Sequence, residues 1–269
     1  MAKGISLHVG LNRVDPAHYS GWDGSLNACE NDARDMECIA VQQRFQTSLL
    51  LREQANRNEL IGAVKQAAAE LQPGDIFLLS YSGHGGQLPD LNGEEPDGQD
   101  ETWCLFDGEL LDDELNELWG GFREKVRILV ISDSCHSGTI VKEANNSQLI
   151  FSEYTPRFMD NQFALATYSR NRDFYDGLLQ RKKGIPGEEI RASIILLSGC
   201  QDNQYSYDGA FNGAFTGALK RVWNGGKFNK NYRVFHRQIQ NLLPAYQSPG
   251  FLTSGRYDPE FENQRPFSV

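Results

Sequence analysis

Short apolar runs alternate along the chain with stretches that carry apolar side chains at helical spacing. The runs are rich in Ile, Leu and Val and cover residues 5–11, 47–51, 75–81, 126–131 and 193–200. Such runs are typical of strands that are buried on both faces of a parallel sheet. The intervening residues 26–45 and 56–71 predict amphipathic helices. This order predicts an α/β fold whose parallel strands are joined by right-handed crossovers.

Weaker patterns predict the remaining elements. They are a hairpin arm at 102–106, helices at 112–119, 212–219 and 231–243, and an edge strand with Pro249 at 247–255. Residues 139–191 are the least regular part of the chain and are locally basic. A stretch of this length with weak structure indicates a functional loop or lid.

Two of the apolar runs end on small polar turns that carry a histidine and a cysteine. His84 lies in the turn 82–86, Ser-Gly-His-Gly-Gly, and Cys135 lies in the turn 133–138, Asp-Ser-Cys-His-Ser-Gly. The carboxyl ends of parallel strands meet at one edge of a sheet, where ligands bind in open α/β folds. We therefore expect His84 and Cys135 to lie together at that edge.

This pairing predicts nucleophilic catalysis by a thiol. A neighbouring imidazole favours the thiolate of Cys135 and gives a proton to a leaving amine. The glycines beside His84 let the backbone approach a substrate, and the N–H groups of Gly85 and Cys135 are the expected oxyanion donors. His136 is the alternative base, but strand alternation sends neighbouring side chains apart, so His84 is preferred.

The two motifs, with the histidine about 50 residues before the cysteine, resemble the metacaspase and orthocaspase branch of the caspase-like cysteine peptidases. The resemblance runs from Ile5 to about Gly255. It implies a caspase-like sandwich, in which helices flank a mostly parallel six-stranded sheet with an antiparallel edge strand. The activity it implies is peptide-bond hydrolysis through an acyl-enzyme. The single domain, 1–269, is expected to comprise a large-subunit-like part (1–140), a loop-rich linker (141–192) and a small-subunit-like part (193–269).

The same resemblance implies a pocket for the side chain before the scissile bond, lined by Cys29, Asp32, Ser82 and Asp133. Two carboxylates in one pocket repel each other unless a cation lies between them. An arginine supplies that cation and pairs with carboxylates in bidentate fashion. We therefore expect cleavage after Arg, then Lys, and little after Asp. From the residues alone, Asp32 is a helix N-terminal acid and Asp133 a strand-end acid that binds turn N–H groups.

The most acidic part of the chain runs from Asp90 to Glu117. Its composition fits a solvated loop, and its spacing lacks the EF-hand pattern. The resemblance implies a regulatory calcium site in this region, and its candidate ligands are Asp97, Asp100, Asp112 and Asp113. No cofactor is expected for the chemistry itself, so calcium would act only as an activator.

The linker carries the basic run Arg181, Lys182 and Lys183. If the pocket takes Arg or Lys, these residues are candidates for self-cleavage. The alternative is a merely solvated basic loop.

Composition and charge limit the class of partner and the cellular compartment. A chain of 269 residues with 39% hydrophobic content can bury a full core. The net charge of −10 disfavours nucleic acid as a partner and favours basic peptides or divalent cations. Five cysteines without paired spacing favour a reducing compartment, and no apolar run is long enough to cross a bilayer. We expect a cytoplasmic protein without a membrane partner that acts on peptides with basic residues; by the resemblance it is a monomer.

Two other functions remain open. A catalytically silent caspase-like scaffold is expected to lose the cysteine or the histidine, whereas this chain keeps both. The second is a different thiol hydrolase or transferase on the same architecture. Its preference for acyl thioesters over arginyl peptides would distinguish it from a peptidase.

Overall fold

A six-stranded sheet forms the centre of the computed structural model, which describes residues 2–90, 98–135, 155–180, 189–200 and 206–269. In sheet order the strands are β2 (Gln46–Leu51), β1 (Gly4–Gly10), β3 (Ile76–Ser82), β7 (Arg127–Asp133), β8 (Ser193–Ser198) and β9 (Gly250–Gly255). Every neighbouring pair is parallel except β8 and β9. The predicted mostly parallel sheet with an antiparallel edge strand is confirmed.

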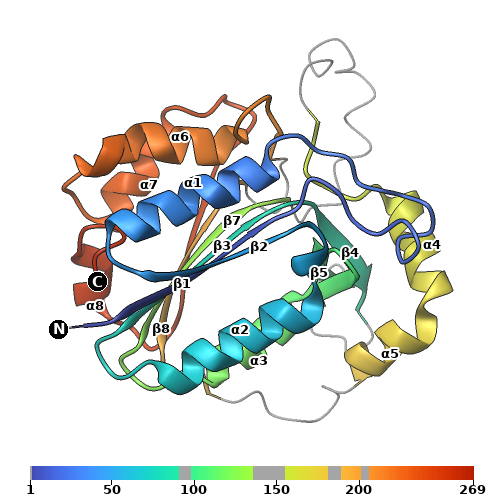
Figure 1. The fold of residues 1–269 in the computed structure, drawn as a ribbon, viewed down its shortest axis with the longest axis horizontal. Helices are drawn as coiled ribbons and strands as arrows, with labels where there is room; N and C mark the ends of the chain where they lie inside the picture. The colour runs from blue at the N-terminus through green and yellow to red at the C-terminus, as the bar shows by residue number, and fades with distance from the viewer. Residues whose placement is uncertain (1, 91–97, 136–154, 181–188, 201–205) are drawn as a thin grey trace.

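Helices cover both faces of this sheet (Figure 1). One face carries α1 (Cys29–Gln42), α6 (Ala214–Trp223) and α7 (Tyr232–Gln240), and the other carries α2 (Arg57–Glu70) and α3 (Asp112–Gly120). Three further short helices are η1 (Arg52–Gln54), η4 (Asn224–Gly226) and α8 (Pro259–Asn263). Among the described residues, no helix combines the length and the apolar character needed to cross a membrane.

The core follows the alternation of side chains along the central strands. On β3, Phe77 and Leu79 pack on the side of α2 and α3, whereas Ile76 and Leu78 pack on the side of α1 and α6. All four side chains are fully buried. Full burial of such a side chain contributes about 1.5–3 kcal/mol, and burial on both faces explains why these runs contain so few polar residues.

Two parts of the structure differ from the prediction. A second sheet, β4 (Gly85–Pro89), β5 (Gln99–Leu105) and β6 (Gly108–Leu111), replaces the expected single hairpin arm. The sequence of β4, Gly-Gly-Gln-Leu-Pro, has little β propensity, so its pattern gives no strand signal. The stretch expected to be loop-rich contains α4 (Asn161–Arg170) and α5 (Arg172–Gln180), whose mixed polar composition hides their single buried faces.

His8 is a structural residue in the interior of β1. Its Nδ1 lies 2.8 Å from the Ser80 hydroxyl and its Nε2 lies 2.9 Å from the Ser6 hydroxyl. Burial lowers the pKa of His8 to about 3. The imidazole is therefore neutral in the folded protein and satisfied by two hydroxyl groups.

Replacing His8 with glutamine is expected to make unfolding less sensitive to acid. The stability that neutral His8 contributes is fully present above its unfolded pKa of 6.5 and is lost as the pH falls towards the folded value of about 3. At about pH 5 the loss amounts to about 2 kcal/mol. Urea unfolding of both proteins should show their free energies of unfolding converging by that amount between about pH 7.5 and pH 5. A difference that stays constant with pH would contradict a buried, neutral His8.

Candidate active site

The strand register brings the two predicted catalytic residues to one edge of the sheet. Ser82, at the end of β3, is the register partner of Asp133, at the end of β7. His84 and Cys135 each follow that pair by two residues and are both buried, as expected for strand ends that deliver side chains to one site.

Gly85 lets the two loops approach each other closely. A Cβ atom on Gly85 would lie 1.6 Å from the carbonyl oxygen of Cys135, so only glycine fits here. The N–H groups of Gly85 and Cys135 both donate to one carbonyl oxygen, that of Arg157, at 3.0 and 3.2 Å. Two N–H donors that converge on one oxygen have the geometry of an oxyanion site.

The imidazole of His84 is held with one ring nitrogen free to accept a proton. Nε2 lies 3.1 Å from the carbonyl oxygen of Gly24, and because a carbonyl can only accept, Nε2 carries the hydrogen. Nδ1 is buried and has no hydrogen-bond partner within the described residues. Burial lowers the pKa of His84 to about 4, against the opposing effect of the Gly24 hydrogen bond. His84 is therefore a neutral base whose lone pair is on Nδ1.

The Cys135 thiol is also uncharged in this state. Burial raises the pKa of Cys135 well above its ordinary value, and a hydrogen bond with Cys200 raises it further. The backbone N–H of Ser206 donates to the sulfur and acts in the opposite direction. The thiol lies 3.3 Å from the carbonyl oxygen of Ser206. Since both the thiol and the imidazole are neutral, the nucleophile must lose its proton as it attacks.

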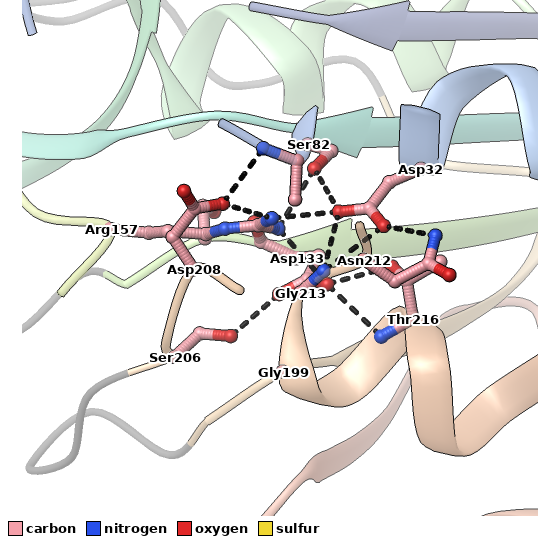
Figure 2. Close-up of polar contacts among 12 residues, drawn as sticks. Asp32, Ser82, Asp133, Arg157, Gly199, Ser206, Asp208, Asn212, Gly213 and Thr216 are labelled. Atoms are coloured by element: carbon pink, nitrogen blue, oxygen red, sulfur yellow. Dashed lines mark hydrogen bonds and ion pairs between the residues drawn. The ribbon is translucent and has the colours of Figure 1, made fainter. Parts of the chain in front are cut away.

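Beside these residues, an acidic pocket encloses the guanidinium group of Arg157 (Figure 2). Its terminal nitrogens lie 2.7 Å from the Asp32 carboxylate, 3.0 Å from that of Asp133 and 2.9 Å from that of Asp208. The Ser82 hydroxyl oxygen also accepts a hydrogen bond from the guanidinium, at 2.8 Å. Burial would lower the pKa of Arg157, but the surrounding acidic groups, Asp133 foremost, raise it well above its usual value. The pocket thus fits a cation.

Hydrogen bonds from β3 and the α6 region hold the carboxylates in place. Asp32 accepts from the Ser82 hydroxyl at 2.8 Å and from the Asn212 amide at 2.9 Å. Asp133 accepts from the backbone N–H and the hydroxyl of Thr216, at 3.0 and 2.7 Å. Burial raises the pKa of Asp32 to about 6, although the neighbouring guanidinium lowers it. The pocket therefore holds its charge most completely above that pH.

All four residues predicted for this pocket, Cys29, Asp32, Ser82 and Asp133, lie near Arg157. Sequence reasoning missed Asp208, whose carboxylate also accepts from the N–H groups of residues 27 and 28 at 2.7 and 3.2 Å. α1 begins at residue 29 rather than at the predicted residue 26, and Asp208 binds the two N–H groups that immediately precede it. The sequence places Asp208 only in the polar stretch between the apolar run 193–200 and the helix predicted at 212–219.

Gly213 forms the floor of the pocket and was also missed. A Cβ atom on Gly213 would lie 2.6 Å from three atoms of the Arg157 guanidinium, so the flat group lies directly against this backbone. A planar guanidinium fits such a floor better than a tetrahedral ammonium does.

The predicted calcium ligands do not converge in the described structure. Asp97 lies outside the described residues, Asp100 is buried in β5, and Asp112 and Asp113 begin α3. Within the described ranges, no group of three or more His, Cys, Asp or Glu side chains is placed to hold a metal ion. Calcium binding by these four residues stays a prediction, and no catalytic step is assigned to the metal. His136, Arg181, Lys182 and Lys183 also lie outside the described residues.

The comparisons with known proteins agree on one family. Residues 14–266 match the model of the caspase domain family. Metacaspase-1 of Emericella nidulans is 30% identical over 299 residues, which cover 98% of this chain and 71% of that protein. Metacaspase-1 of Schizosaccharomyces pombe is 28% identical, and the match spans 80% of this chain but only 57% of that protein. The crystal structure of protein GSU0716 from Geobacter sulfurreducens has a TM-score of 0.91 and 55% identity over 99% of both chains.

Proposed function

Because the chain belongs to the caspase domain family, as its two turn motifs predicted, we propose that it is a cysteine endopeptidase that cleaves after Arg and, more slowly, after Lys. The observation that carries the proposal is the placement of Arg157. Its side chain fills the acidic pocket while its carbonyl oxygen meets two N–H donors beside Cys135. This is the arrangement that a substrate residue before a scissile bond needs.

The proposed mechanism uses the groups in the positions described. Cys135 attacks the carbonyl carbon while Nδ1 of His84 accepts the thiol proton, and the N–H groups of Gly85 and Cys135 stabilise the developing oxyanion. The protonated imidazole then gives its proton to the leaving amine, and water hydrolyses the thioester. The hydrogen bond of Nε2 to Gly24 supports this role because it leaves Nδ1 as the basic nitrogen.

The charge of the pocket supports the proposed specificity. Asp32, Asp133 and Asp208 repel an acidic side chain, and each favours a cation. Arginine offers two terminal nitrogens that reach different carboxylates at once, whereas the lysine ammonium is a point charge. The expected order is therefore Arg, then Lys, with little cleavage after Asp.

Matched peptide substrates with Arg, Lys or Asp before the scissile bond test the function directly. We expect hydrolysis after Arg, slower hydrolysis after Lys, and complete loss of both with Cys135→Ala. The assay is run with calcium and with a chelator, because calcium as an activator is a separate proposal that rests on the four acidic ligand candidates. Cleavage after Asp alone would overturn the pocket assignment, and no turnover of any peptide would favour a silent scaffold.

A further inference from the structure

Residues 155–159 cross the active site and form backbone hydrogen bonds on both sides of the Arg157 carbonyl group. Before the Arg157 carbonyl, the Arg157 N–H donates to Ser206 at 2.9 Å and Thr155 accepts from Asp208 at 2.8 Å, with an antiparallel bridge between Pro156 and Tyr207. After it, the Met159 N–H donates to the Gly85 carbonyl at 2.8 Å. Backbone bonds on both sides of one carbonyl group are the mode by which peptidases and other strand-binding proteins hold extended peptides.

Two side chains of this segment, those of Arg157 and Met159, are fully buried. Arg157 is fully buried among the three carboxylates of the acidic pocket. Two residues later, Met159 is fully buried in an apolar cluster with Val14, Tyr19 and Cys104. The peptide bond that lies between these two anchors and beside Cys135 is the one joining Arg157 to Phe158.

The same contacts exclude an external substrate. The pocket for the residue before the scissile bond is filled by Arg157, and both oxyanion donors are bound to its carbonyl oxygen. A substrate arginine would have to displace a guanidinium that already pairs with Asp32, Asp133 and Asp208. The active site is therefore closed by a piece of its own chain.

We propose that residues 155–159 are an internal substrate that keeps the peptidase latent, and that the enzyme cuts its own chain between Arg157 and Phe158. The inference rests on the proposed function. It differs from the basic run at residues 181–183, which the sequence alone favoured for self-cleavage.

The chemical step balances without any added reagent except water. The Cys135 sulfur forms a bond with the Arg157 carbonyl carbon as the thiol proton passes to His84. The bond from that carbon to the Phe158 nitrogen breaks, and the nitrogen takes the proton from His84 to become a free amine. Water then hydrolyses the thioester, which leaves an Arg157 carboxylate and restores the thiol.

The geometry makes the first cut intramolecular. Arg157 and Met159, on either side of Phe158, are fully buried in the site of their own molecule, so another molecule has poor access to the bond after Arg157. We expect the wild-type chain to yield fragments 1–157 and 158–269 at a first-order rate that does not change with protein concentration. Intact mass and an N-terminal sequence of Phe-Met-Asp identify the cut, and hydrolysis of an arginyl peptide should show a lag that ends as the fragments appear.

Three variants test whether the segment acts as an internal substrate or only as a structural part of the fold. Arg157→Ala should not be cut at this bond and should hydrolyse the peptide without a lag, at an initial rate at least about tenfold above the wild-type initial rate, because the pocket is vacated. Arg157→Lys keeps the cation and should restore the cut at the same bond at a lower rate. Arg170→Ala, which removes an exposed arginine from nearby α4, should behave as wild type in both measurements. Thermal unfolding verifies that each variant is folded.

The outcomes distinguish the failure of the internal substrate from the failure of the proposed peptidase function. Wild-type protein that hydrolyses arginyl peptides at a constant rate while its chain stays intact at Arg157–Phe158 would overturn the internal substrate and leave the proposed function standing. Arg157→Ala with an unchanged lag would overturn it as well. If no folded variant, Arg157→Ala included, hydrolyses any arginyl peptide, the proposed function itself fails.

Discussion

Replacing Gly85 with alanine is expected to lower kcat for arginyl peptides by about 10³-fold or more while the protein stays folded. The new Cβ atom would lie 1.6 Å from the carbonyl oxygen of Cys135 and 2.7 Å from its carbonyl carbon. Both are backbone atoms, which cannot turn aside as a flexible side chain does. The loops that carry the two oxyanion donors must therefore move apart by about 1 Å or more, and a displacement of that size alone costs about 10²-fold.

A second glycine offers a matched control. Gly62 lies in α2, and a Cβ atom there would meet no atom within 4 Å. Gly62→Ala should keep wild-type kcat and gain up to about 1 kcal/mol in the free energy of unfolding, since alanine favours helix. Kinetics with one arginyl peptide and urea unfolding compare the two variants. A folded Gly85→Ala protein with kcat within about tenfold of wild type would contradict the assignment of Gly85 and Cys135 as oxyanion donors.

The location of His84 and Cys135 at one edge of the sheet could be predicted from sequence because strand periodicity fixes where the strands end. The strands that end at Ser82 and Asp133 contain few polar residues, so their carboxyl ends are easy to locate, and parallel pairing puts those ends side by side. The residues two positions beyond those ends must then share one edge of the sheet. The local sequence pattern was sufficient to locate His84 and Cys135 because each lies in the loop that directly follows a central strand.

Arg157 and Asp208 could not be found in this way. Arg157 is one of several basic residues in an irregular stretch, and nothing near it in the sequence shows that a pocket on β3, β7 and α1 will receive its side chain. That pairing is decided by tertiary contacts, chiefly the backbone bonds to Ser206 and Gly85. Charge density indicated residues 181–183 as candidates for self-cleavage, but it carries no information about which backbone segment lies beside Cys135.

A substrate whose residue in the pocket is uncharged is expected to show how much the positive charge of arginine contributes to kcat/KM. Citrulline has the shape of arginine without the positive charge, so a peptide with citrulline before the scissile bond leaves the buried carboxylates without a cation. Breaking a buried ion pair by removing one partner costs about 3–5 kcal/mol, which corresponds to a loss in kcat/KM of about 10²–10³-fold or more. Wild-type enzyme should therefore prefer the arginyl peptide by at least that factor.

Removing one carboxylate should reduce this preference in a measurable way. In Asp32→Asn the pocket keeps Asp133 and Asp208, so we expect the ratio of kcat/KM for arginine over citrulline to fall by about tenfold or more without disappearing. Asp35→Asn is the control: Asp35 lies on the same helix and also contacts Asn212, but its ion pair is with Lys220 and not with Arg157. Its preference for arginine should match that of wild type. An equal loss for both peptides in Asp32→Asn would mean that Asp32 supports the fold of the pocket rather than its charge.

The pH dependence of the ratio of kcat/KM for arginine over citrulline tests independently whether the negative charge of Asp32 favours a cation in the pocket. With a guanidinium in the pocket, burial still raises the pKa of Asp32 to about 6. As the pH falls through that value, Asp32 takes up a proton and the pocket loses one negative charge. The arginine preference of the wild-type enzyme should therefore decline below about pH 6 towards the value of Asp32→Asn, whose own ratio should not change over that range. A wild-type preference that rises on acidification would show that the charge of Asp32 does not select the cation.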